Sequence, residues 1–171
     1  MAKGTNSELT RDVRIIKKDR LRFTKNSISS TLCYIAILFN VLYYVDLYSR
    51  DSIDPTGKTF FYSVTIGLSV VCNLLFLLFT FLASEGVKNY SKLFSIVLIV
   101  IGALQIARIF GLPLMAMNTT LTDGSSLINI FEFATMALCL TISSVCCIVA
   151  GVVGIIKTLT LEKYKKETGL S

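Results

Sequence analysis

The sequence predicts an all-α integral membrane protein, a four-span, up-down bundle of transmembrane helices with both termini in the cytoplasm. Apolar residues gather in four blocks, at about residues 28–48, 60–83, 93–117 and 130–156. Each block reaches the length of about 20 residues that a helix needs to cross a bilayer. Charged residues make up 16% of the chain, whereas they are about a quarter of a soluble domain. The segments between the blocks are too short to bury a core of their own.

This pattern divides the chain into three parts. We expect residues 1–26 to form a basic cytoplasmic arm, residues 27–157 the transmembrane domain and residues 158–171 a cytoplasmic tail. Because the connections are short, neighbouring helices are expected to run antiparallel. Glu162 and Lys166 are spaced to pair along a helix, so the tail is expected to continue the fourth helix.

The placement of charge predicts the orientation. Most of the 17 lysines and arginines precede the first block, separate the second block from the third, or follow the fourth. The opposite side of the membrane carries only Arg50 and Lys58 and is otherwise acidic. Since basic loops stay in the cytoplasm, we expect a multi-pass plasma-membrane protein with both termini inside.

The N-terminal arm has the pattern of an amphipathic helix on the inner leaflet. Thr5 and Glu8 are spaced as a capping box, and Leu9, Val13 and Ile16 then recur on one helical face. The basic residues around that face are Arg11, Arg14, Lys17, Lys18, Arg20 and Arg22. They are expected to attract anionic lipid. A plain topology anchor or a docking site for an acidic partner also fits the pattern, but a nucleic-acid site does not.

The composition disfavours an enzyme. The chain has no histidine, the commonest general base and metal ligand near neutral pH. All five cysteines, Cys33, Cys72, Cys139, Cys146 and Cys147, fall inside the apolar blocks and are interpreted as small buried hydrophobic residues. We therefore expect no catalysis, no cofactor and no bound metal.

A few polar residues interrupt the apolar blocks and form the candidate site. They are Arg108, Gln105, Glu132, Asp46, Asn40 and Asn73. An arginine near mid-membrane costs at least about 2.5 kcal/mol and cannot shed its charge. Side chains on a helix lean toward its N-terminus, so Arg108 is directed back toward the bilayer centre, on the same face as Gln105. We expect an internal partner for Arg108, first Glu132 or Asp46, with Asn40 or Asn73 as neutral alternatives.

Three interpretations of Arg108 follow. It could belong to a structural clasp that fixes the order of the helices, since polar groups between membrane helices contribute roughly 0.6–2 kcal/mol each. It could contact a partner subunit or an anionic lipid. It could instead line a substrate or ion site, the usual hypothesis for an ionisable residue inside a membrane.

Small residues predict where helices approach closely. Ala103, Ala107 and Gly111 share one face of the third block, and Ala150, Gly151 and Gly154 mark the fourth. Such faces serve packing within a bundle or between subunits. Pro113 is expected to kink the outer end of the third block, because proline lacks a backbone N–H.

Two functions remain in view. The first is a non-catalytic subunit or scaffold of a membrane complex, as a homo- or hetero-oligomer. The alternative is a small oligomeric transporter or channel in which Arg108 and Gln105 line a path for an anionic substrate. Against the alternative, the sequence shows no inverted repeat between its two halves.

Overall fold

The computed structural model describes residues 15–16, 24–51, 60–118, 126 and 128–168. The predicted amphipathic arm therefore lies almost wholly outside the described residues, and with it Arg11, Arg14, Lys17, Lys18, Arg20 and Arg22. The outer connections at residues 52–59 and 119–125 lie outside them as well.

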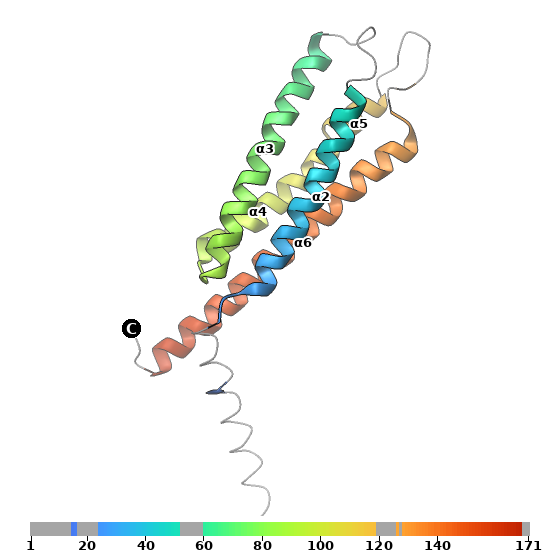
Figure 1. Ribbon diagram of the computed structural model, residues 1–171. Helices are drawn as coiled ribbons and strands as arrows, with labels where there is room; N and C mark the ends of the chain where they lie inside the picture. The colour runs from blue at the N-terminus through green and yellow to red at the C-terminus, as the bar shows by residue number, and fades with distance from the viewer. Residues whose placement is uncertain (1–14, 17–23, 52–59, 119–125, 127, 169–171) are drawn as a thin grey trace, which may run out of the picture.

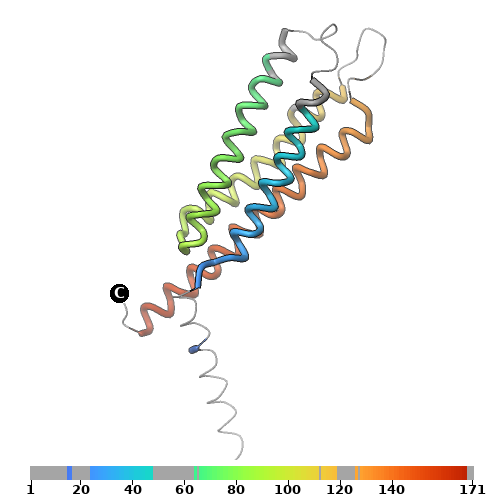
Figure 2. Tube along the Cα trace, in the orientation of Figure 1, coloured from blue at the N-terminus to red at the C-terminus, as the bar shows by residue number. Residues whose placement is uncertain are grey.

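The described chain is helical between its connections, which confirms the predicted all-helical class (Figures 1 and 2). The helices are α2 (Ser27–Asp51), α3 (Phe60–Lys88), α4 (Lys92–Ile109), α5 (Leu112–Asn118) and α6 (Ile130–Thr168). Four segments are long and apolar enough to cross a membrane, with α4 and α5 together forming the third. The chain is thus a multi-pass membrane protein by length and composition.

The last helix continues well beyond the length of a membrane span, as predicted for the tail. At about 1.5 Å per residue, the 39 residues of α6 reach about 58 Å, against about 30 Å for the hydrocarbon core. The C-terminal part of α6 therefore projects past the end of the bundle, as Figure 1 shows in red.

The third span is broken where Pro113 predicted a kink. Phe110 donates its backbone N–H to the Ala107 carbonyl at 3.2 Å, and Gly111 donates to the Arg108 carbonyl at 3.1 Å. These tighter bonds end α4, and α5 starts at Leu112 with the proline in its first turn. A proline is tolerated there because the first N–H groups of a helix have no intrahelical partner.

Three apolar clusters divide the bundle along its length. The loop-end cluster contains Tyr43, Leu47, Ile66, Ala116, Ile128, Met136, Cys139 and Leu140. The middle cluster contains Ala36, Ile101 and Cys147, with Phe76 packed against it. The turn-end cluster, beside the turn between α3 and α4, contains Cys33, Ala83, Val87, Leu98 and Ala150. With Ile109 of α4 packed against the loop-end cluster and Phe76 of α3 against the middle cluster, all four long helices reach both clusters. The chain passes between these clusters in alternating directions. Successive helices therefore run antiparallel.

The packing centres on α6, which makes its most extensive contacts with α4 and α2. Two serine hydroxyls join these helices by donating to backbone carbonyls, Ser143 to Ala36 at 2.8 Å and Ser144 to Gly102 at 2.7 Å. A Cβ on Gly151 would lie 2.6 Å from the Ser95 carbonyl oxygen, so α4 and α6 touch backbone to backbone. The small residues of α6, namely Ala150, Gly151 and Gly154, are buried in this contact.

Gly151→Ala should destabilise the protein by about 1–3 kcal/mol, because the added methyl group forces α4 and α6 apart. Gly67→Ala is the matched control, since a Cβ there meets no atom within 4 Å. The control should be neutral or stabilising by up to about 1 kcal/mol. Thermal unfolding of both variants in mild detergent measures the difference, and equal melting temperatures would contradict the close α4–α6 contact.

Candidate functional site

A layer of buried polar side chains lies between the loop-end and middle clusters. We call this set the polar layer, and its members are Asn40 of α2, Asn73 of α3, Gln105 of α4, and Ser143 and Ser144 of α6. Each is at most 1% exposed. On each of the four helices, residues of the loop-end cluster lie on one side of the polar residue along the chain, and residues of the middle cluster lie on the other side. Residues that pack against a cluster are included with it. The common depth that the sequence predicts for Asn40, Asn73 and Gln105 agrees with this placement.

Arg108 reaches into this layer from one turn further along α4. Its Nη2 donates a hydrogen bond to Oδ1 of Asn73 at 2.9 Å. Its guanidinium carbon lies 5.2 Å from the centre of the Tyr43 ring and 4.9 Å from that of Phe76. Phe76 packs on the middle cluster, so the side chain leans inward, as helix geometry predicts.

These contacts take the place of much of the hydration that stabilises a guanidinium in water. A cation within about 6 Å of an aromatic ring is attracted to its face by about 0.5–2 kcal/mol, and more strongly where water is excluded. The Asn73 oxygen adds a hydrogen bond to a charged donor, worth about 1.5–3 kcal/mol. One side chain of α2 and two of α3 therefore hold the charge that α4 carries.

Several polar atoms of the layer and of Arg108 make no hydrogen bond among the described residues. They are Oδ1 of Asn40, Nδ2 of Asn73, both amide atoms of Gln105 and Nη1 of Arg108. An unpaired buried polar group costs about 1–3 kcal/mol. Apolar side chains would fill this part of the bundle at a lower free-energy cost. The polarity of the layer therefore requires an explanation in terms of structure or function.

The two carboxylates proposed as partners of Arg108 are placed differently. Glu132 lies in the first turn of α6, where its Oε2 accepts the backbone N–H of Asn129 at 2.7 Å. Lys88–Glu85 and Lys92–Glu162 form ion pairs, and neither pair includes Arg108. Asp46 lies on α2, one turn beyond Tyr43. Of the four candidates, the structure brings Asn73 to the guanidinium.

Sequence reasoning missed the two aromatic rings and the two serines. Tyr43 is 1% exposed, and its ring faces the Arg108 guanidinium. Phe76 carries no signal that distinguishes it from other apolar residues of α3. Ser143 and Ser144 could have been noted, because adjacent hydroxyls in a membrane helix commonly bond across helices.

The chemistry available in this layer is limited to one fixed cation, neutral amides and hydroxyls. The described residues contain no group of three or more His, Cys, Asp or Glu side chains that could hold a metal. The arrangement can hold helices in register, or it can present hydrogen-bond donors to an anion. No protein-family model, curated protein or solved structure matches this chain.

Asn73→Leu should destabilise the protein by about 1–3 kcal/mol, because it leaves the buried guanidinium without its oxygen acceptor. Combining it with Arg108→Met should recover part of that loss, because no charge is then stranded. Unfolding in detergent of the two single variants and the double variant gives the coupling energy.

The matched cycle pairs Arg108→Met with Glu132→Gln, which keeps an oxygen to accept the Asn129 N–H. Its coupling is expected to stay within about 0.5 kcal/mol. A strong coupling energy between Arg108 and Glu132, together with additive effects of the Arg108 and Asn73 substitutions, would contradict the Asn73 contact. It would show that Arg108 instead pairs with Glu132, as first expected from the sequence.

Proposed function

We propose that this protein is a non-catalytic membrane protein that acts as a subunit or assembly module of a membrane complex. In this proposal, the polar layer fixes the order and register of the four helices. The exposed face of α4 then receives a membrane helix of the partner, which is another subunit or a second copy of this chain.

The proposal rests on a difference in burial between the two helix faces that are lined by small residues. The α6 face, with Ala150, Gly151 and Gly154, is buried inside the bundle. The other face consists of Ala103 and Ala107 of α4 with Gly111 just beyond its end, and all three are exposed. Helices in a bilayer associate through close packing at small residues, because lipid tails are as apolar as any side chain. A face of this kind that the bundle leaves unused suits a contact between proteins.

The environment of Arg108 supports a structural role for the polar layer. Its guanidinium is held by Asn73 and by the Tyr43 and Phe76 rings, and Gln105 is fully buried. A residue that lines a conducting path would instead be expected to face water. Buried polar groups of this kind can specify register at some cost in stability.

The alternative is transport of an anionic substrate along Arg108 and Gln105. It is favoured by three buried donors without a hydrogen bond among the described residues, at Arg108 Nη1, Asn73 Nδ2 and Gln105 Nε2. Anion flux into liposomes that is lost in Arg108→Met, while the fold is retained, would select this alternative over the assembly role.

Ala103→Leu combined with Ala107→Leu should abolish complex formation by filling the exposed face of α4. The melting temperature should remain near that of the parent, because both positions are exposed in the bundle. Light scattering in mild detergent gives the mass, and gel analysis gives the copurifying chains.

Ala134→Leu is the control, an equal enlargement at an exposed alanine of α6. It should leave the complex intact. A monomeric parent protein without copurifying chains would contradict the assembly role, as would equal effects of the control and the α4 substitutions.

For orientation, we propose that the α3–α4 turn and the end of α6 lie in the cytoplasm, following the bias of basic residues. An impermeant thiol reagent applied to intact cells should label Ser126→Cys but label Lys166→Cys only after permeabilisation. Both positions are exposed, and the five native cysteines lie in the membrane-spanning helices. The opposite labelling pattern would reverse the topology.

A further inference from the structure

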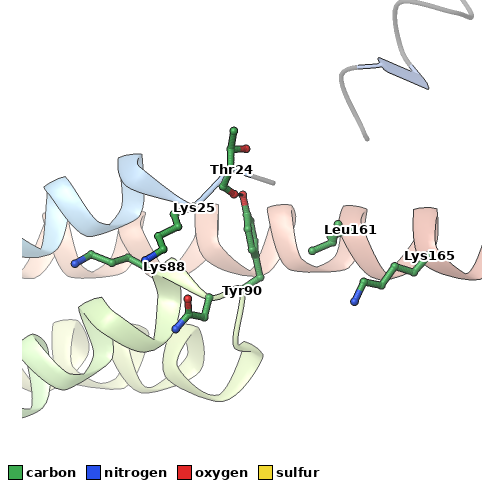
Figure 3. Close-up of a pocket in the computed structure, with 7 residues that line it drawn as sticks. Thr24, Lys25, Lys88, Tyr90, Leu161 and Lys165 are labelled. Atoms are coloured by element: carbon green, nitrogen blue, oxygen red, sulfur yellow. Dashed lines mark hydrogen bonds between the residues drawn. The ribbon is translucent and has the colours of Figure 1, made fainter. Parts of the chain in front are cut away.

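A polar cavity of about 510 Å³ lies at the end of the bundle that carries the α3–α4 turn. Its lining comes from three separate parts of the chain: Thr24 and Lys25 before α2, Lys88, Asn89 and Tyr90 at the turn, and Leu161 and Lys165 on α6. Figure 3 shows Tyr90 in the middle, with Lys25 and Lys88 toward one side and Leu161 and Lys165 toward the other. Leu161 and Lys165 lie on the C-terminal part of α6 and form one wall of the cavity.

The walls of this cavity are tied together by hydrogen bonds. Tyr90 has a positive φ of 57°, a conformation that a bulky residue adopts only at a cost. In that conformation its hydroxyl donates to the Thr24 carbonyl at 2.8 Å. The backbone N–H of Asn26 donates to the Lys88 carbonyl at 3.2 Å, and Lys157 donates to the Asn26 side chain at 2.8 Å. The turn, the start of α2 and α6 are therefore joined around the cavity.

The charge of the cavity is positive. Three of its seven lining residues are lysines, and none is acidic. Lys88 is already engaged by Glu85 and Tyr34. Lys25 and Lys165 add two further ammonium groups to the lining, and neither belongs to the Lys88–Glu85 or the Lys92–Glu162 ion pair. Asn89 and the Thr24 hydroxyl add neutral polar groups beside them.

We propose that this cavity binds the phosphate group of an anionic lipid headgroup. Several ammonium groups with neutral hydrogen-bonding groups beside them match the charge and the acceptor oxygens of a phosphate. Basic pockets between membrane helices at the cytoplasmic surface are suited to such headgroups. The membrane source is supported by position, because Leu93 begins the apolar exposed surface of α4 at the same turn and is 64% exposed. The leaflet follows from the proposed orientation, whereas the binding itself does not depend on it or on the assembly role.

The test uses the full chain in detergent micelles, titrated with short-chain phosphatidic acid and followed by thermal unfolding. The free cysteines, among them buried Cys33 and Cys147, allow unfolding to be read with a thiol-reactive fluorophore. A bound ligand raises the melting temperature with its concentration. Phosphatidylcholine of the same chain length is the neutral-lipid control and should produce no such shift.

Lys25→Gln combined with Lys165→Gln should weaken the apparent affinity for phosphatidic acid on the order of tenfold or more. Lys163→Gln combined with Lys166→Gln removes the same charge from exposed lysines of α6 that do not line the cavity, and it should retain the affinity. Lys25→Arg with Lys165→Arg should retain it as well. An unchanged melting temperature without lipid shows that the variants are folded.

Three outcomes would overturn the proposal. Equal loss in the two glutamine double variants would show general surface attraction. A soluble phosphate, glycerol 3-phosphate, that stabilises the protein at the same concentrations as the lipid would show a site for free phosphate. No shift with phosphatidic acid in the folded parent protein would show that the cavity holds no such ligand.

Discussion

The hydrogen bond between Arg108 and Asn73 is the contact on which the interior of this protein depends. It keeps a permanent charge inside a helix that otherwise suits lipid, and it does so with a neutral oxygen and two aromatic rings. Those partners come from α2 and α3, so three helices must be in register before the charge is accommodated. The alternative, a guanidinium in hydrocarbon, is costly enough to disfavour other arrangements of the same helices.

The rest of the bundle is organised around that level by close packing. Within the polar layer, the serines of α6 donate hydrogen bonds to backbone carbonyls of α2 and α4, and Gly151 lets α4 and α6 touch toward the turn end. By contrast α3 makes fewer contacts with its neighbours, and near mid-membrane the Arg108–Asn73 hydrogen bond adds to the packing of Phe76 against the middle cluster. The polar layer thus compensates for weaker packing of α3, which explains a polar core in a membrane that supplies no hydrophobic drive for helix association.

Much of the fold follows from local properties of the chain and could be predicted. Apolar length defines the four spans, proline defines the break after α4, and the charges at positions 162 and 166 are compatible with the long last helix. The site was predicted only in part. Counting residues places Gln105, Asn40 and Asn73 at one depth in the membrane. It does not show how each helix is rotated about its axis, and so it does not show which side chains face one another. For that reason the sequence favours carboxylates as partners of Arg108 and does not indicate Tyr43 or Phe76.

The sequence by itself determined the class, the spans, the kink and the inward direction of Arg108, because each depends on the spacing of residues within one helix. Only the tertiary structure decided that Asn73 meets the guanidinium, that the α6 glycines face inward while the α4 alanines face outward, and that Lys25, Lys88 and Lys165 share a cavity. These facts depend on how helices distant in sequence are rotated and placed against one another. That placement is set by the sum of many contacts between helices, which no single segment of the chain contains.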